Sequence, residues 1–358
     1  MIMYRYQFSR LIKRYWAVAA VFLVLAFAVR LIVIKAYDND KTRVKLDPKA
    51  LSCLSEMIAE SREMSRAEQF AFICEYEIQA FAQNDRAAAE AANYYHSALD
   101  NCLKLDGVTE YSNSGEGIVS ADIPPDLIEN EKLYANMGKS DIAYTDPYML
   151  FLKLRTFALT DIFAVILVGL FVCATCENGL HKQIHIMKNR KLFLRSREIT
   201  LTALLFIAYT FGFIADIILS GAFKTVGLFG ATVQSELNFL YSPIRLTFSG
   251  LTIWLYATGL MKLLITYSLL IICARSLCSI RKYLITAVSA LTVFSAAAVY
   301  IPEVSPYLFC AVSDKMTELM YISYIKALDG SECVSVLLFC MALLGGLYAW
   351  RWCGYRTE

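Results

Sequence analysis

The chain has 358 residues, of which 58% are hydrophobic and only 18% are charged. Its mean hydropathy is +0.48 and its formal net charge is +2. In soluble globular domains about 45–50% of residues are apolar and about 25% are charged. The composition therefore excludes an ordinary soluble domain and predicts a polytopic membrane protein with no nucleic-acid partner.

Six long apolar runs follow one another along the chain. A helix needs about 20 mostly apolar residues to cross the ~30 Å hydrocarbon core, and in lipid a helix satisfies its own backbone. The runs that meet this requirement are Tyr15–Ile34, Thr156–Cys176, Ile199–Leu219, Gly250–Ala274, Tyr283–Ile301 and Val334–Trp350. The predicted fold is all-α, with an N-terminal amphipathic segment and first span (1–36), an extracellular domain (37–154) and five further spans (155–358).

The basic residues between these runs predict the orientation. Lys and Arg in the flanks resist translocation, so the richer side faces the cytoplasm. Fifteen lie on the side of the two termini, and four lie in the two short loops opposite. Both termini are expected to be cytoplasmic. No small-residue cleavage site follows Ile34, so the first run is interpreted as a span rather than a signal peptide. Arg30, near its outer end, is expected to snorkel to the headgroups.

The long connection between the first two spans is acidic and starts with helical patterns. Residues 37–154 hold 21 Asp plus Glu against 11 Lys plus Arg. Apolar residues recur at spacings of three and four over 51–58 and 70–76, and Arg86–Ala98 is rich in alanine. Beyond Asp106, Gly, Ser, Asn and Pro predict loops or short strands. The acidity suits either an attractor for cationic substrates or an ordinary solvated surface.

Cysteine spacing leaves several interpretations open. Disulfides persist outside the cell, and two external pairs, Cys53–Cys74 and Cys310–Cys333, have suitable positions, but isolated thiols fit equally. The run Cys173-x2-Cys176-x4-His181-x3-His185 has the donor types of a zinc site. Its central gap is much shorter than in zinc fingers, and Cys173 lies in a span. We therefore predict no metal site.

Three ionisable residues fall inside predicted spans, where charges are costly and usually face the bundle interior. They are Asp161, Asp216 and Lys262. Counted from the cytoplasmic ends, Lys262 and Asp216 differ in depth by about 7 Å, which a lysine side chain can bridge. An ion pair between them is the first interpretation. The alternatives are a polar lining of a substrate path and a misplaced span boundary.

The sequence contains no catalytic motif. It has no phosphate-binding Gly-x4-Gly-Lys-Ser/Thr loop, no Gly-x-Ser-x-Gly and no His-Glu-x-x-His. We therefore expect no enzyme activity and no cofactor in this chain. Such a protein works passively, uses an ion gradient or takes energy from a partner.

The basic connection between the second and third spans carries a family pattern. The second span ends in Glu177-x-Gly179-x-x-Lys182, a short basic stretch passes Arg190, and Arg195 precedes the next span. This arrangement resembles type-2 ABC transporter permeases, in particular those that export sodium, bacitracin and lantibiotics. Asn precedes Arg190 where Ser is usual, and an arginine replaces the closing lysine.

The resemblance implies a role for several segments. Residues 178–198 would form a coupling helix that docks on a partner ATPase, and residues 302–333 would contain a short re-entrant helix. Two permease chains, identical or related, would assemble on two ATPase subunits, which bind ATP and Mg²⁺. The location would be a bacterial plasma membrane, and the substrate an amphipathic peptide or antibiotic. The alternatives are an ion-coupled secondary transporter and a non-transporting sensor or immunity protein with a peptide-binding extracellular domain.

Overall fold

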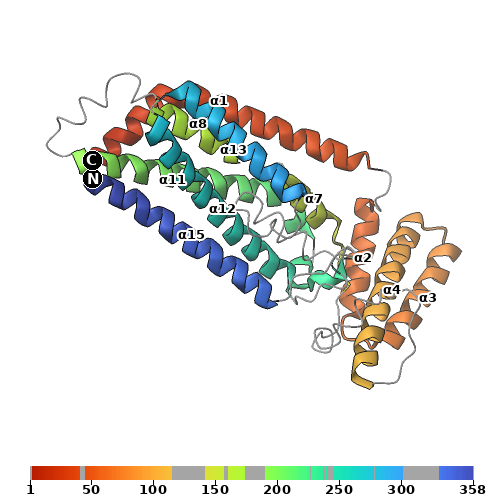
Figure 1. Ribbon diagram of the computed structural model, residues 1–358. Coiled ribbons are helices and arrows are strands. Elements are labelled where there is room, and N and C mark those ends of the chain that lie inside the picture. The colour runs from red at the N-terminus through yellow and green to blue at the C-terminus, as the bar shows by residue number, and fades with distance from the viewer. Residues whose placement is uncertain are drawn as a thin grey trace.

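The protein is described by a computed structural model (Figure 1). The structure describes residues 2–40, 45–114, 142–156, 160–173, 190–225, 227–236, 239, 246–277, 279–300 and 330–357. Throughout these ranges the chain is mostly helical, and they contain no strand, only an isolated bridge between Thr232 and Thr247. Most of the helices lie side by side as a bundle, and the helices of residues 48–114 form a separate group at one end, which we call the cap.

The bundle contains seven long or medium helical segments within the described ranges. They are α1 (Ile2–Asp38), α7 (Asp146–Thr156), α8 (Thr160–Val168) with its π-helical extension η1 (Gly169–Cys173), α11 (Arg190–Ser220), α12 (Phe248–Leu277), α13 (Ile280–Tyr300) and α15 (Gly330–Thr357). Three short 3-10 turns, η2 (Ala222–Lys224), η3 (Leu228–Gly230) and η4 (Val233–Ser235), follow α11. Both chain ends lie at the bundle end opposite the cap, which we call the termini end (Figure 1).

Four helical stretches among the described residues are long and apolar enough to cross a membrane: Ala20–Asp38, Asp146–Cys173, Leu192–Ser220 and Phe248–Leu277. They correspond to the first four predicted spans. α13 and α15 occupy the positions predicted for the last two, and α15 contains a shorter apolar stretch, Leu337–Arg351. The chain is therefore a mostly helical membrane protein with at least four helices of spanning length.

Two predicted boundaries differ from the structure. The second apolar stretch begins at Asp146, about three turns before the predicted start at Thr156. Tyr148 and Phe151 lie within the predicted extracellular domain (37–154), but they are fully buried in the bundle core. In the cap, α4 continues as a helix to Ser114, past the loop predicted from Asp106. At the second stretch, burial against the bundle core extends the helix beyond the most apolar part of the sequence.

The cap consists of α2 (Pro48–Ser61), α3 (Arg66–Ala82) and α4 (Arg86–Ser114), as the three helical patterns predicted. α4 contacts both α2 and α3 and holds them together. Its alanines Ala91 and Ala92 are fully buried, which allows the helices to approach closely. The Tyr95 hydroxyl donates to the Ser61 hydroxyl oxygen at 2.6 Å, which fixes α4 to the end of α2.

A polar junction joins the cap to the bundle. The Tyr37 hydroxyl at the end of α1 donates to the Asp146 carbonyl oxygen at 3.2 Å, and the Tyr144 hydroxyl donates to the Asp146 carboxylate at 3.3 Å. The Tyr94 hydroxyl of α4 donates to the Ala143 carbonyl oxygen at 3.2 Å. Burial raises the pKa of Tyr94 to about 12. The start of α7 therefore anchors the cap as well as the bundle.

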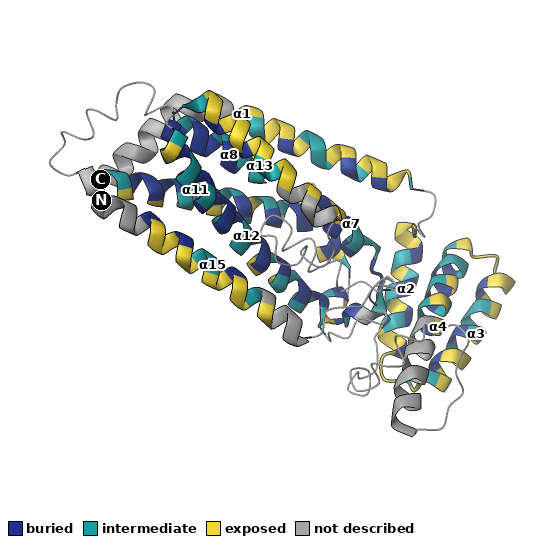
Figure 2. Ribbon diagram, in the orientation of Figure 1, coloured by how far each residue is buried: buried dark blue, intermediate teal, exposed yellow. Residues whose placement is uncertain are grey.

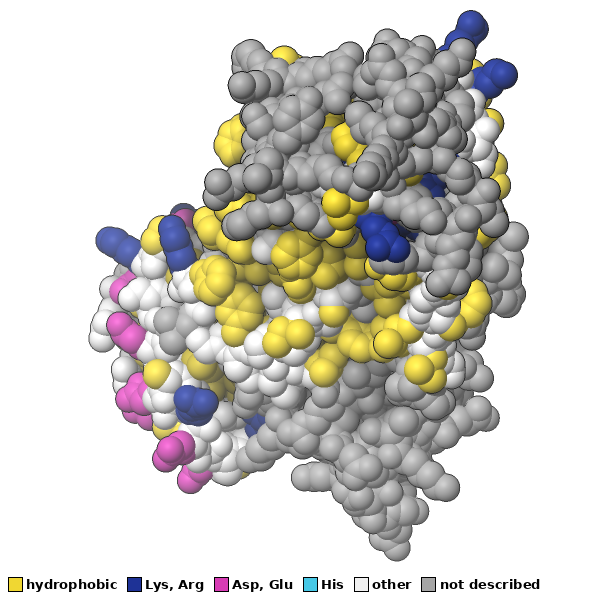
Figure 3. Space-filling view, turned by 90° about the vertical axis from the view of Figure 1, so that its left-hand side faces the viewer, with side chains coloured by type: hydrophobic (Ala, Val, Ile, Leu, Met, Phe, Trp, Pro, Cys, Tyr) yellow, Lys and Arg dark blue, Asp and Glu magenta, His cyan; other side chains and the backbone are white. Residues whose placement is uncertain are grey.

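Burial divides the bundle helices into central and peripheral ones (Figure 2). α12 is buried along much of its length, whereas α1, α13 and α15 present long exposed apolar faces. In Figure 3, which shows the termini end, apolar side chains cover a broad central area and the visible acidic side chains lie at one edge. The exposed apolar side chains along α1, α13 and α15 suit contact with lipid.

Candidate functional site

The most polar place inside the bundle surrounds Asp216, near the cap end of α11. Its side chain is fully buried. Arg30 of α1 donates from Nε to the Oδ1 atom of Asp216 at 2.6 Å, and Arg155 of α7 donates from Nη1 to Oδ2 at 3.2 Å. We call these three residues the cap-end cluster. One carboxylate therefore ties α11 to two other helices.

The cap-end cluster holds more positive than negative charge. Two guanidinium groups face one carboxylate, and their side chains are only 11% and 14% exposed. Within the described part of the chain, neither Arg30 nor Arg155 has a second acidic partner. Unpaired charge is costly in a dry interior, and among the described residues dipoles and aromatic faces are placed to offset the surplus.

Aromatic rings and hydroxyls supply part of that balance at Arg155. Its guanidinium carbon lies 5.0 Å from the ring centre of Tyr209 and 4.7 Å from that of Phe213. Its Nη2 donates to the Tyr209 hydroxyl oxygen at 3.2 Å. Cation–π contacts of this kind strengthen when water is excluded. Two aromatic rings of α11 therefore lie against the guanidinium of Arg155.

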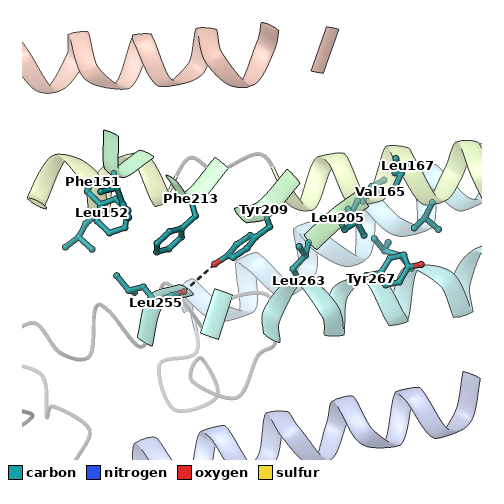
Figure 4. Close-up of a cluster of buried hydrophobic side chains, with 14 of the residues drawn as sticks. Phe151, Leu152, Val165, Leu167, Leu205, Tyr209, Phe213, Leu255, Leu263 and Tyr267 are labelled. Carbon is teal, nitrogen blue, oxygen red and sulfur yellow. Dashed lines mark hydrogen bonds between the residues drawn. The ribbon is translucent and has the colours of Figure 1, made fainter. Parts of the chain in front are cut away.

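Tyr209 extends the network to α12. Its hydroxyl group lies 3.4 Å from the carbonyl oxygen of Leu255 (Figure 4) and 3.2 Å from that of Tyr256. A Cβ atom on Gly259 would collide with that hydroxyl oxygen and lie 3.2 Å from Cζ of the ring. Glycine at this position lets the tyrosine reach the α12 backbone. The network therefore links α1, α7, α11 and α12.

A second ionic group lies at the termini end of the same helix. Glu198 of α11 forms an ion pair with Arg275 of α12 and accepts from Nη2 of Arg351 of α15 at 2.7 Å. Arg351 also donates to the Ser268 hydroxyl oxygen at 3.1 Å and lies 5.2 Å from the ring centre of Tyr267. We call Glu198, Arg275 and Arg351 the termini-end cluster. It ties α11 to α12 and α15.

The two acids lie on one face of α11. Asp216 follows Glu198 by 18 residues, which is about five helical turns and about 27 Å along the axis. Each acid is held by two arginines that come from two different helices. α11 is therefore fastened near both ends of its apolar stretch, in the same angular direction.

The predicted Lys262–Asp216 ion pair is wrong. The structure pairs Lys262 with Asp161 of α8, Nζ to Oδ2 at 3.5 Å, while Asp216 is held by two arginines. Arg30, whose side chain is 11% exposed, pairs with Asp216, and its guanidinium lies beside Gly212, one turn before Asp216. A buried carboxylate without a partner is costly, and this cost favours an arginine side chain that turns toward Asp216 over one that extends to the headgroups.

Other predicted site residues are less fully described. Glu177, Gly179 and Lys182 lie outside the described residues. Arg190 is the first residue of α11, and Arg195 is exposed in its second turn.

The cysteine predictions also have mixed outcomes. Cys53 and Cys74 are free thiols, so the disulfide between them is not formed. The Cys310–Cys333 pair lies outside the described side chains, as do Cys176, His181 and His185 of the zinc-like run. Within the described ranges, no three His, Cys, Asp or Glu side chains gather as metal ligands do.

The span pattern gives no reason to single out Arg155, Glu198 or Arg351 as functional candidates, because each lies at a predicted span boundary. A signal was present, since Glu198 is an acid among the basic residues Arg195, Arg197 and Arg275 at one predicted membrane edge.

Comparisons with protein-family models, with curated proteins and with solved structures found no match for this chain.

Proposed function

We propose that this chain is the transmembrane subunit of an ATP-driven exporter of the type-2 ABC class. The observation that carries the proposal is the course of α11. This helix begins at Arg190, inside the segment 178–198 that resembles a coupling helix, and continues without a break to Ser220. A displacement of the coupling segment would therefore act directly on a helix of spanning length.

The ionic clusters supply the mechanical connection. If α11 is pushed at its termini end, Glu198 moves first relative to the two arginines of the termini-end cluster. The same displacement then moves Asp216 relative to the two arginines of the cap-end cluster. Because hydrogen-bonded ion pairs have discrete geometries, such a helix favours two defined positions rather than a gradual shift. This is the behaviour that alternation between inward-open and outward-open states requires.

The proposal includes the finer topology and the partners. The chain would have six spans, cytoplasmic termini and an extracellular cap, in a bacterial plasma membrane. Two such chains, identical or related, would assemble on two ATPase subunits that bind ATP and Mg²⁺. The substrate would be an amphipathic peptide or antibiotic. The chain's own residues would bind substrate and transmit motion, and they would perform no chemical step.

Co-purification with an ATP-binding cassette protein tests the proposal. The chain is tagged and co-expressed with ATP-binding cassette proteins from its own genome, and any complex that forms is reconstituted in vesicles. We expect the two proteins to co-purify and substrate to stimulate ATP hydrolysis. Lys182→Gln should reduce the stimulated rate, whereas Lys224→Gln, on the exposed turn beyond the other end of α11, should leave it unchanged.

Two results would contradict the exporter. One is that no ATPase co-purifies with the chain. The other is that Glu177→Gln and Lys182→Gln leave the ATPase activity of a complex unchanged. In either case the resemblance of residues 177–195 to a coupling segment would reflect only the usual excess of basic residues on the cytoplasmic side.

An ion-coupled carrier is the second candidate, and the Asp161–Lys262 pair favours it. The two side chains are 28% and 15% exposed, with 3.5 Å between Oδ2 and Nζ. Opposite charges within helices of spanning length are typical of ion pathways. Vesicles without ATPase separate the two candidates, because a carrier would transport substrate along an ion gradient and lose that transport in Asp161→Asn.

A further inference from the structure

α3 is the cap helix that lies farthest from the bundle (Figure 1). One side of it packs against the rest of the cap through Ile73 and Ala80, which are buried, and through Gln69, whose side chain donates to the Ser61 carbonyl oxygen at 3.0 Å. This packing fixes which side of α3 faces outward. The outward side is the one that a partner could reach.

Three large apolar side chains stand on the flank of α3 next to this outward side. Phe70, Ile78 and Phe81 are 44%, 70% and 75% exposed. At about 100° per residue, they fall within about 80° of arc and extend along about three turns. We call them the α3 stripe. Apolar groups that are aligned rather than scattered on a solvated helix are typical of a docking surface.

Acidic residues border the α3 stripe on both sides. Glu68 and Glu75 lie about 60–80° beyond Ile78 around the helix, and Glu77 lies about 20° beyond Phe70. Glu77 also contacts His96 at 3.0 Å. The whole helix carries three glutamates and a single arginine, Arg66. The surroundings are negative as well, since residues 37–154 hold 21 acids and 11 bases.

We propose that the α3 stripe binds a cationic amphipathic helical peptide. The apolar face of the peptide would cover Phe70, Ile78 and Phe81, and its lysines or arginines would lie beside Glu68, Glu75 and Glu77. Such a helix-in-groove or helix-on-helix contact combines apolar burial with complementary charge. The inference rests on the proposed function in one respect, since it names the substrate class of the exporter.

Charge decides between this occupant and two others. A second copy of the chain would bring the same glutamates to the contact, and their repulsion would oppose a dimer through this stripe. An anionic lipid surface would be repelled in the same way. A cationic peptide is the occupant for which the apolar and the electrostatic contributions have the same sign.

A binding assay on the whole protein tests the inference without ATP or ATPase. The full chain is reconstituted in nanodiscs of zwitterionic lipid, and empty nanodiscs provide the background. The probe is a fluorescent amphipathic Lys/Leu peptide of about 18 residues, about five helical turns. Two control probes have the same composition in scrambled order and the same sequence with glutamine for lysine. Binding is measured by anisotropy at physiological salt.

We expect the amphipathic peptide to bind and both control peptides to bind at least about tenfold more weakly. Ile78→Ser/Phe81→Ser should weaken binding by about tenfold or more, and its fold should persist because both side chains are exposed. Glu75→Gln should weaken binding in a salt-dependent way. Glu60→Gln, an exposed acid on α2, is the matched control and should leave binding unchanged.

Equal binding by the Ile78→Ser/Phe81→Ser variant, or equal binding of the scrambled peptide, would overturn the inference. A dimer that dissociates in the same variant, without peptide binding, would assign the stripe to a second copy instead. The outcome is separate from that of the exporter proposal. Failed co-purification with an ATPase would leave peptide binding intact, and failed peptide binding would leave the ATPase complex intact.

Discussion

Removal of the Asp216 carboxylate should destabilise the bundle more than removal of either arginine charge. In the native cap-end cluster one negative charge faces two positive charges. Asp216→Asn would leave two largely buried guanidinium groups without the carboxylate that faces them, whereas Arg30→Gln would leave one neutral pair. Breaking a buried pair by removing the partner costs about 3–5 kcal/mol. We expect a cost in that range for Asp216→Asn and about 1.5–3 kcal/mol, the contribution of one charged hydrogen bond, for Arg30→Gln.

Unfolding by SDS in mixed micelles, followed by tryptophan fluorescence, measures these differences. The double variant Asp216→Asn/Arg30→Gln removes one charge of each sign, so its cost should be smaller than the sum of the single costs. We expect a coupling of about 1–3 kcal/mol. An additive double variant, or an Arg30→Gln cost equal to that of Asp216→Asn, would refute the electrostatic reasoning.

Three further predictions concern packing, titration and the cap. Gly259→Ala should destabilise the bundle by about 1–3 kcal/mol in the same assay, because its methyl group would displace the Tyr209 hydroxyl. Gly345→Ala is the matched control, since a Cβ there meets nothing within 4 Å; an equal loss in both variants would contradict the steric reason. The folded pKa of Tyr94, about 12, lies above its ordinary value of 10.0. Its contribution to stability is therefore complete below pH 10 and declines toward pH 12, and tyrosinate absorbance during alkaline unfolding measures it; in Tyr94→Phe that component should disappear. Ser65→Ala should cost the cap about 1 kcal/mol, measured by hydrogen exchange of the first turn of α3, because it removes the capping box with Glu68; unchanged exchange would contradict this role.

The sequence predicted the positions of the helices better than it predicted which side chains contact each other. Apolar runs located the first four spans, and spacings of three and four located α2 and α3, because both signals depend only on neighbouring residues. The partners of Asp216 could not be found in this way. Arg30 lies 186 positions away along the chain and Arg155 lies 61 away. Which helix packs beside which decides such pairs, and no local pattern contains that information.

Residue types near Asp216 do carry a partial signal. Gly212 precedes it by one helical turn, and this glycine leaves space for the Arg30 guanidinium. A small residue one turn from a buried acid is the local condition for an arginine to enter from a neighbouring helix. The similar depths of Lys262 and Asp216 in their predicted spans suggested that the two residues pair. Depth does not specify toward which neighbouring helix each side chain points. The structure gives Lys262 a partner on α8 instead.

The spacing of the two acids on α11 has a consequence for the surrounding lipid. The clusters are separated by about 27 Å along the helix, close to the ~30 Å hydrocarbon thickness of a typical bilayer. Four helices are tied to α11 at its two ends, so sliding of these helices is limited to the defined steps that the ion pairs allow, and the apolar height of the bundle does not adjust continuously to the lipid. In membranes with shorter or longer acyl chains, hydrophobic mismatch must therefore be absorbed by deformation of the bilayer or by tilting of the whole bundle.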